Sequence, residues 1–400
     1  ATDPAGEREE AVGRVVGFYQ DTATRAETCL THYPRPTAAP PAAGVESGVG
    51  LGSQGRALGW LRVERVNLLA CLHYATDRAQ HAGVVGLTAG LVSLLRSDGP
   101  WAQAITLHTQ AVAAARHLGD RLAEATALTD LGDVRRLAGD YAGAAEVLEQ
   151  ALGLSRDLGH QLGEATTLLI LAAVRQVTGD YAGTGGVLEQ ALGLYCGLGP
   201  QFGEATTLTE LGNLRHVAGD PEGAARMLDH ALGLCRGLGH QRGEAHTLTN
   251  LGIVRWETGD YPGAARLLEQ ARDLHHDLGD RRGEARALTF LGVVRWLTGD
   301  YPGATGVLER ALGLFRDLGH RHGEANTLTY LGAVRRETGD YPDAARLLNH
   351  ALGLYRDFSN RHLEANARTE LAAVHYRTGD YRGAARLLDQ ALEDLDRRSR

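Results

Sequence analysis

The 400-residue chain contains no lysine, so all 41 of its basic residues are arginine. This absence excludes every chemistry that requires a lysine amine, including a phosphate-binding GxxxxGK[ST] loop and Schiff-base catalysis. Acidic residues number 49, and the net charge is −8. Because phosphate binding requires a basic face, we expect no nucleic-acid partner for this segment.

Cysteine is also scarce. The four cysteines, Cys29, Cys71, Cys196 and Cys235, form no CxxC motif and have no zinc-ligand spacing with histidine. We therefore predict no metal site and no cofactor, and the thiols are typical of a reduced, cytoplasmic protein. No apolar run approaches the ~18 residues of a membrane span. The chain begins at Ala1 without methionine or a signal-peptide pattern, so we expect a fragment of a longer protein.

Glycine, in contrast, is abundant, with 52 residues, and most glycines recur at fixed positions of a forty-residue period. A Gly-Asp pair begins at Gly139 and returns every forty residues as far as Gly379. A Leu-Gly or Leu-Ala pair keeps the same period from Leu131 to Leu371, and we expect the small residue of this pair to let helices approach closely. Internal repetition at this spacing indicates a repeat architecture, and we predict seven repeats over residues 121–400.

The repeat at residues 241–280 shows what each unit of sequence encodes. Its apolar residues recur with a period near 3.6, which is typical of two amphipathic helices. Gly259 suits the left-handed residue that ends the first helix, and Asp260 suits the N-cap of the second. One such pair cannot bury its apolar faces alone, so we predict an all-α fold, a right-handed superhelical solenoid of antiparallel helix pairs.

One repeat reads Leu291-Gly292, then Ala304, then Ala311-Leu312. This order resembles the tetratricopeptide repeat. The resemblance implies stacked helix pairs whose first helices line a concave groove. The period of forty is longer than the ~34 residues usual for that family.

A second difference from that family lies in one column, meaning the residues at one position of successive repeats. Where the family commonly has tyrosine, six repeats carry arginine, from Arg135 to Arg335. The column lies at the edge of the buried stripe, so each guanidinium must reach solvent or pair with an acid. We expect it to pair with the glutamate column that runs from Glu124 to Glu364.

Three segments precede the regular repeats. Residues 1–33 predict an N-terminal helical segment, residues 34–54 a Pro/Gly-rich linker, and residues 55–120 a helical lead-in with one degenerate repeat. The glycines at 50, 52 and 55 match a dinucleotide-binding GxGxxG pattern, but neither a strand nor a βαβ unit surrounds them. We therefore reject that interpretation.

The phrases ALGWLRVERVNLLACLHYA, residues 57–75, and HLGDRLAEATALTDLGDVRRLAGDYAGA, residues 117–144, resemble a more specific group. They are similar to the region after the ATPase core of actinobacterial NB-ARC or STAND-type signal-transduction NTPases. The resemblance implies a C-terminal sensor or scaffold portion of a transcriptional or signalling regulator. No ATPase motif is present in the chain itself.

Catalysis is not expected. Seventeen histidines are present, but no HExxH motif or carboxylate–histidine arrangement occurs. Binding of a peptide or protein in the concave groove is the favoured function, because columns that vary among repeats can recognise a partner. Within residues 241–340 the varying columns bring aromatic residues beside arginine, which is typical of binding hot spots. The predicted partner-binding residues are His246, Asn250, Ile253, Trp256, Arg286, Phe290, Val293, Trp296, Asn326, Tyr330 and Arg336.

Two alternatives remain open. The array could self-assemble as a homo-oligomer through its N-terminal end, which only an imperfect repeat covers. It could instead be the small-ligand sensor domain of a STAND-type regulator, although the sequence does not reveal a pocket. A third interpretation concerns Trp256 and Trp296, which would pack into the core rather than face a groove.

Overall fold

The computed structural model describes residues 5–31, 50–178, 180–199, 201–358 and 361–396. Within these ranges every regular element is an α-helix, and helices pack in consecutive pairs, which confirms the predicted all-α helix-pair array. None of the described helices is both long and apolar enough to cross a membrane. The helices are α1 (Ala5–Thr31), α2 (Gln54–Val63), α3 (Arg65–Asp77), α4 (His81–Gly90), α5 (Val92–Asp98), α6 (Trp101–Leu118), α7 (Arg121–Leu137), α8 (Tyr141–Asp157), α9 (Gln161–Thr178), α10 (Tyr181–Leu198), α11 (Gln201–Val217), α12 (Pro221–Gly237), α13 (Gln241–Glu257), α14 (Tyr261–Asp277), α15 (Arg281–Leu297), α16 (Tyr301–Asp317), α17 (Arg321–Glu337), α18 (Tyr341–Phe358), α19 (Arg361–Arg377) and α20 (Tyr381–Asp396).

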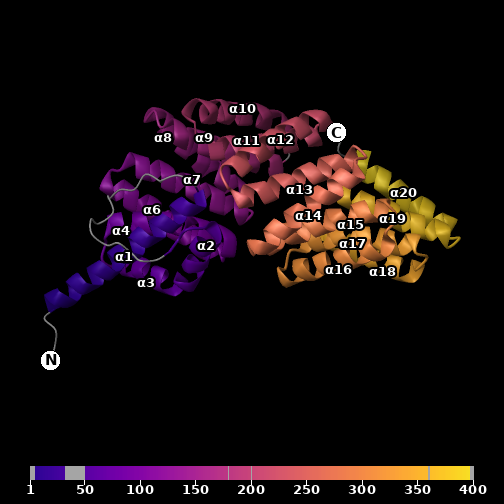
Figure 1. Ribbon diagram of the computed structural model, residues 1–400, viewed down its shortest axis with the longest axis horizontal. Helices are drawn as coiled ribbons and strands as arrows, with labels where there is room; N and C mark the ends of the chain where they lie inside the picture. Colours follow the sequence, from indigo (N-terminus) through magenta and orange to yellow (C-terminus); the bar gives the residue numbers. More distant parts are fainter. Residues whose placement is uncertain (1–4, 32–49, 179, 200, 359–360, 397–400) are drawn as a thin grey trace. The chain divides into compact units, whose positions relative to one another are not determined.

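The helices, most of which are labelled in Figure 1, belong to two compact units. Unit 1 ends at Leu211 and unit 2 begins at Gly212, so the boundary falls inside α11. No change in the repeat pattern marks this point, and the sequence did not predict it.

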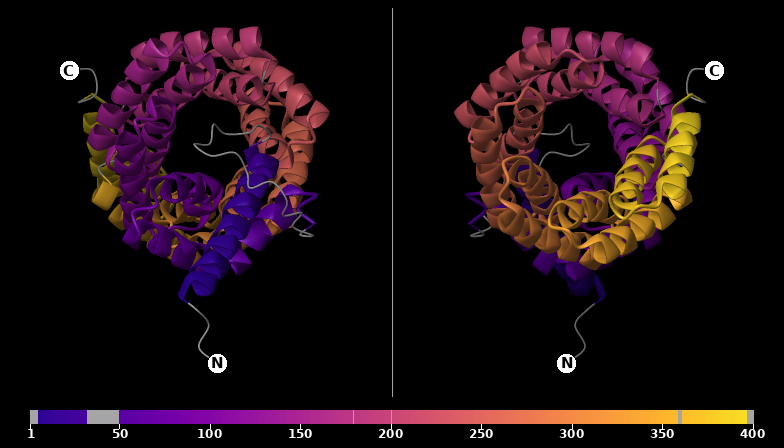
Figure 2. Two further views of the ribbon diagram at one scale, coloured as in Figure 1. Left: turned by 90° about the vertical axis from the view of Figure 1, so that its left-hand side faces the viewer. Right: turned by 90° about the vertical axis from the view of Figure 1, so that its right-hand side faces the viewer.

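Each unit has two layers of helices. From α7 to α10 and from α12 to α20, each helix packs against the next. Odd-numbered helices also contact one another across a repeat, as α13 contacts α15 and α15 contacts α17. Because the odd-numbered helices approach each other more closely, each unit curves towards them, and we call them the inner layer. Figure 2 shows the two layers in the orange and yellow helices of unit 2.

The repeated turn has the predicted geometry. Gly259 ends α13 with a φ of 84°, and Gly299 ends α15 with a φ of 85°. The carboxylate of Asp260 then caps α14 by accepting a hydrogen bond of 3.0 Å from the N–H of Gly263. A left-handed residue followed by a cap satisfies backbone groups at both helix ends, so the recurring Gly-Asp pair sets the turn between paired helices.

Small residues also let paired helices approach closely, as expected. A Cβ atom on Gly252 would stand 2.7 Å from Cγ of Leu268, and one on Gly292 would stand 2.5 Å from Cγ of Leu308. Both leucines are fully buried. The glycine of the Leu-Gly column therefore provides the space that the facing leucine occupies.

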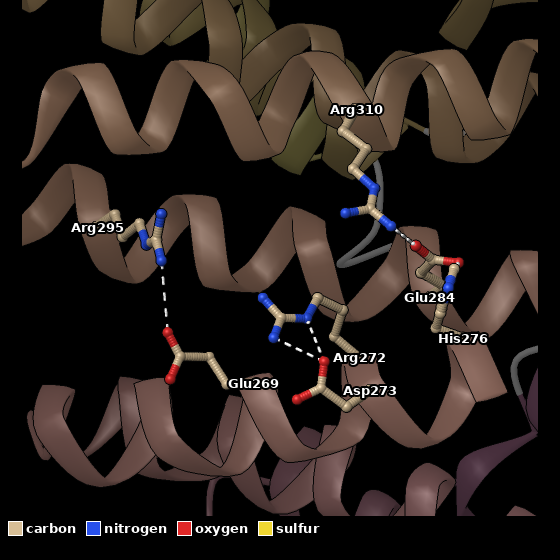
Figure 3. A network of polar contacts seen from close by, with 7 residues as sticks. All are labelled: Glu269, Arg272, Asp273, His276, Glu284, Arg295 and Arg310. Carbon is tan, nitrogen blue, oxygen red and sulfur yellow. Dashed lines mark hydrogen bonds and ion pairs between the residues drawn. The ribbon is translucent and has the colours of Figure 1, made fainter.

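The arginine column does not pair as the sequence suggested. Nη2 of Arg295 lies 3.4 Å from Oε1 of Glu269 on the preceding outer helix, and Nη2 of Arg335 lies 2.9 Å from Oε1 of Glu309. Figure 3 shows the Arg295–Glu269 pair between neighbouring helices. The prediction of pairing with the column from Glu124 to Glu364 is wrong. Those glutamates lie at the opposite end of the inner helix, and each intervening residue adds about 1.5 Å along the helix axis.

That glutamate column has other partners. Arg316 at the end of α16 donates to Glu324 at the start of α17 over 2.8 Å, and Arg236 donates to Glu244 over the same distance. Glu284 is almost fully buried and pairs with both His276 and Arg310, as Figure 3 shows. Except for Arg310, which lies within the following outer helix α16, these partners join the end of an outer helix to the beginning of the next inner helix.

The first helix packs on the lead-in helices of unit 1. Glu27 of α1 is buried and accepts hydrogen bonds of 3.0 Å from both the N–H and the hydroxyl group of Ser93 on α5. Ala23 lies so close to α4 that a Cβ atom on Gly90 would stand 2.7 Å from its own Cβ. Most of the predicted linker at residues 34–54 lies outside the described residues.

Candidate functional site

A cavity of about 260 Å³ opens on the inner layer of unit 2. It lies between α15 and α17, and Phe315 from the outer helix α16 contributes to its wall. Its inner-layer positions place it on the face where varying columns were expected to recognise a partner. The lining residues are Arg282, Arg286, Thr289, Phe290, Phe315, His320, His322, Gly323 and Asn326.

The cavity is positively charged. Arg282 and Arg286 line it one turn apart on α15. Desolvation lowers the pKa values of His320 and His322, and the nearby charge of Arg282 lowers them further. Both imidazoles are therefore neutral near pH 7, and the two guanidinium groups give the lining its charge. No acidic side chain belongs to the lining.

Local structure fixes His320. The N–H of Gly323 donates a hydrogen bond of 3.0 Å to Nδ1 of His320, so this imidazole caps α17 in the way that aspartate caps other helices. Its ring stacks on Phe315, with centroids 5.3 Å apart. Phe315 in turn fits only because residue 323 is glycine, since a Cβ atom there would stand 2.5 Å from the phenyl ring. The back wall of the cavity is thus held by packing rather than by a loop.

Several residues that the sequence predicted to bind a partner meet at or beside this cavity. Arg286, Phe290 and Asn326 line it directly. Nη2 of Arg286 donates a hydrogen bond of 2.8 Å to Oδ1 of Asn250, which is buried on α13. The Trp256 ring lies against that of Phe290, with centroids 5.9 Å apart and an interplanar angle of 43°.

Three further predicted residues lie half-buried along the inner layer. Trp296 and Tyr330 both pack against the hydrophobic core of the C-terminal repeats. Burial raises the pKa of Tyr330 to about 12, and the carboxylates of Glu257 and Glu370 add to that effect. Arg336 forms an ion pair with Glu370, so its charge is already balanced.

The remaining three predicted residues are placed differently. Ile253 and Val293 are buried, with 7% and 0% of their surface exposed, so the expectation that they present side chains to a partner is corrected. Both lie on inner helices that contact a neighbouring inner helix, since α13 contacts α15 and α15 contacts α17. His246 is exposed on α13.

Sequence reasoning missed Arg282, Phe315, His320 and His322 as parts of the site. Their columns contain helix caps, first-turn residues and outer-helix ends, which looked structural. A signal was available in the column of Arg282 and His322, which carries leucine at 122 and 162 and changes to arginine or histidine from Arg242 onward.

The comparisons with known proteins agree with this architecture. A family model described as "Tetratricopeptide repeat" matches residues 85–157, 203–277, 243–317, 283–357 and 323–396. No curated protein matches the chain.

Several solved structures share the fold. The Rap conjugation gene regulator of plasmid pLS20, in complex with the Phr* peptide, has a TM-score of 0.59 and 14% identity over 83% of this chain and 94% of its own. The apo form of RapI has a TM-score of 0.57 and 12% identity, covering 68% and 98% respectively. A STAND protein with a tetratricopeptide repeat sensor from Pyrococcus horikoshii has a TM-score of 0.56 and 13% identity, covering 94% of this chain and 64% of that one.

Proposed function

This chain belongs to the tetratricopeptide repeat family, and we propose that the inner layer of unit 2 binds a peptide or an extended protein segment that carries an acidic side chain. The role is binding rather than catalysis. The acidic group of the peptide enters the cavity between α15 and α17, and neighbouring apolar side chains lie on the half-buried aromatic rings beside it.

The main support for this proposal is that arginine side chains and aromatic rings line the same cavity. Arg282 and Arg286 line the cavity together with Phe290 and Phe315. Arginine forms strong, often bidentate, hydrogen bonds to carboxylates. Aromatic rings next to arginine provide large contact areas at a small entropic cost, which is typical of binding hot spots. An acidic peptide segment with apolar flanks has the matching chemistry.

The charges around the site favour an acidic ligand side chain over a basic one. Arg336 is neutralised by Glu370, whereas Arg282 forms no ion pair with a carboxylate among the described residues. A carboxylate that enters the cavity therefore gains a guanidinium partner without displacing an existing one.

The solved structures support a regulatory context for this proposal. One of them holds a peptide, and another is a sensor-bearing STAND protein. Together with the phrases at residues 57–75 and 117–144, these neighbours support the proposal that the chain is the repeat portion of a signal-transduction or transcriptional regulator.

The proposal is tested by screening the full chain against an array of ten-residue peptides. The array contains a central Asp or Glu with apolar flanks, matched peptides in which Asn or Gln replaces the acid, and matched peptides with Arg at that place. Selected peptides are then titrated by fluorescence anisotropy. We expect the acidic peptides to bind and their amide counterparts to bind about tenfold more weakly, because a charge-assisted hydrogen bond is lost.

Two variants locate the binding. Arg282→Ala should weaken binding of the acidic peptides about tenfold or more. Arg266→Ala removes the same charge from an exposed position on the outer helix α14 and should leave the affinity unchanged. Equal binding of acidic and amide peptides, or an equal effect of the two variants, would contradict the proposal.

A further inference from the structure

A second cavity lies in unit 1, far along the sequence from the site in unit 2. Its volume is about 220 Å³, and it is enclosed by the inner helices α7, α9 and α11 with side chains of the outer helices α8 and α10. An apolar cavity of about 150 Å³ is large enough to hold a benzene ring. This space can therefore hold one aromatic ring with a substituent.

The cavity arises from one column of the repeat. Residues 155, 195, 235, 275, 315 and 355 occupy the same position in successive repeats, at the end of an outer helix. Four of them carry a ring, namely Tyr195, His275, Phe315 and Tyr355, and the two exceptions are Ser155 and Cys235. The cavity lies at Ser155, where the side chain is smallest.

The glycine that accommodates a ring is nevertheless kept opposite Ser155. A Cβ atom on Gly203 would stand 2.1 Å from the Tyr195 ring, so that glycine is required by the ring. Gly163 stands at the same position opposite Ser155, where a Cβ atom would stand 2.3 Å from Nδ1 of His160 and 3.1 Å from Oγ of Ser155. The later repeat combines the same glycine and histidine with a ring, since Phe315 stacks on His320 beside Gly323. Residue 155 supplies no ring at the corresponding place.

The lining combines apolar surface with hydrogen-bonding groups. Leu162, Ile170 and Phe202 provide the apolar part. Oγ of Ser155 is buried and has no hydrogen-bond partner among the described residues, and a buried hydroxyl in that state carries a free-energy penalty that a ligand could remove. The hydroxyl groups of Tyr195 and Thr166 lie 3.0 Å apart at the same cavity.

One carboxylate and one guanidinium group reach the cavity. Asp130, which is buried, lines the wall. Arg96 also lines it, and its Nε lies 2.7 Å from Oδ2 of Asp133, a carboxylate that also pairs with Arg136. Desolvation lowers the pKa of His160, and this imidazole is therefore neutral near pH 7. The buried oxygen atoms of Ser155 and Asp130 favour a ligand that can donate a hydrogen bond, which benzoate cannot do.

We propose that the unit 1 cavity binds a small aromatic alcohol or amine, with its ring in the space that the Tyr195 and Phe315 rings fill in their own repeats. The hydroxyl or amino group donates to the acceptors around Asp130 and Ser155. This site is separate from the peptide site proposed for unit 2, and a different experiment tests it.

The test titrates the full chain with p-cresol and tyramine, observed by saturation-transfer NMR and isothermal titration calorimetry, with benzoate as the anionic counterpart. We expect p-cresol and tyramine to bind with millimolar or tighter affinity and benzoate to bind at least about tenfold more weakly. Absence of saturable binding by both p-cresol and tyramine would overturn the proposal.

Three variants place the ligand. Ser155→Phe introduces the ring found at position 315 opposite a retained glycine, so it should fold and reduce affinity more than tenfold. Ser155→Ala keeps the cavity but removes the hydroxyl acceptor, so it should weaken p-cresol binding severalfold, which is less than the loss expected for Ser155→Phe. Leu169→Trp narrows the cavity from a half-buried position on α9 and serves if Ser155→Phe fails to fold. Unchanged binding in a folded Ser155→Phe or Leu169→Trp protein would overturn the proposal.

Discussion

The indole ring of Trp256 and the phenyl ring of Phe290 lie with their centroids 5.9 Å apart, although they come from different inner helices, α13 and α15. Both rings are half-buried and pack against the same hydrophobic cluster around Leu268 and Leu291. Each ring therefore has one side in the core and another side available to a partner. The sequence posed a choice between a core and a groove role for Trp256 and Trp296, and the half-burial of both indole rings is compatible with either role.

The first prediction follows from this double role. Phe290→Ala should weaken binding of a selected acidic peptide about tenfold, as expected for a hot-spot ring, and should also lower stability. Tyr301→Ala removes a half-buried ring from the outer helix α16. It should lower stability without changing affinity. Anisotropy titrations and urea unfolding of both variants check this, and loss of peptide affinity in Tyr301→Ala would show that affinity merely follows stability.

The second prediction concerns close helix approach. Gly292→Ala should destabilise unit 2 by about 1 kcal/mol or more, because the new methyl group meets Leu308 and overpacks the interface. The protein should still fold, since Ala172 and Ala372 occupy this column in two other repeats. Thermal unfolding followed by circular dichroism measures the effect.

A matched control for that variant is Gly313→Ala. Gly313 is exposed in the middle of α16, and a Cβ atom there would meet nothing within 4 Å. This change should stabilise the protein by about 0.5–1 kcal/mol, because alanine loses less backbone entropy in a helix than glycine does. Equal effects at both positions would mean that Leu308 does not set the helix spacing.

The third prediction compares two leucines of the same column, one in the last repeat and one in the repeat before it. Leu352 is 4% exposed, whereas Leu392, its equivalent in the last repeat, is 60% exposed. Leu352→Ala should cost about 2–5 kcal/mol, and Leu392→Ala should cost less than about 1 kcal/mol because little buried surface is lost. Urea unfolding of the two variants checks the difference. A large cost at Leu392 would indicate that another surface, such as a second copy of the chain, covers the last helix in solution.

The fourth prediction concerns acid stability. Burial alone would raise the pKa of Asp280, but hydrogen bonds from His275 and from the backbone N–H of Gly283 lower it to about 2. Since the unfolded value is about 3.9, this carboxylate stabilises the fold above that pH. The contribution is lost as the pH falls through the folded pKa of about 2. Asp280→Asn should therefore lower stability at pH 6 and make stability less dependent on pH between about 5 and 2.

The control for that variant is Asp300→Asn. Asp300 caps α16 in the same way, with a hydrogen bond of 2.9 Å from the N–H of Gly303, but it is exposed and has no histidine partner. We expect a smaller loss of stability at pH 6, because no hydrogen bond from a histidine is lost. Chemical unfolding of both variants across this pH range measures the difference, and parallel profiles would contradict the role assigned to the His275–Asp280 pair.

The sequence by itself determined the repeated architecture. A forty-residue period, a helical apolar spacing and the Gly-Asp pair at Gly259 and Asp260 depend on local backbone preferences, which act over a few residues. The Leu-Gly column also predicted close helix approach, since glycine opposite leucine leaves the required space. These features were confirmed because each depends on contacts between neighbours in the chain or in adjacent helices.

Only the tertiary structure decided which members of a column face solvent and which partners they find. Val293 looked like a surface residue but is fully buried. Arg295 pairs with Glu269 rather than with the glutamate column that its sequence pattern suggested. The cavity at Ser155 likewise depends on the space that the side chains of three inner helices leave empty. The burial of a side chain and the volume of a cavity depend on many residues that are distant in the sequence. The periodicity within one repeat therefore does not determine them.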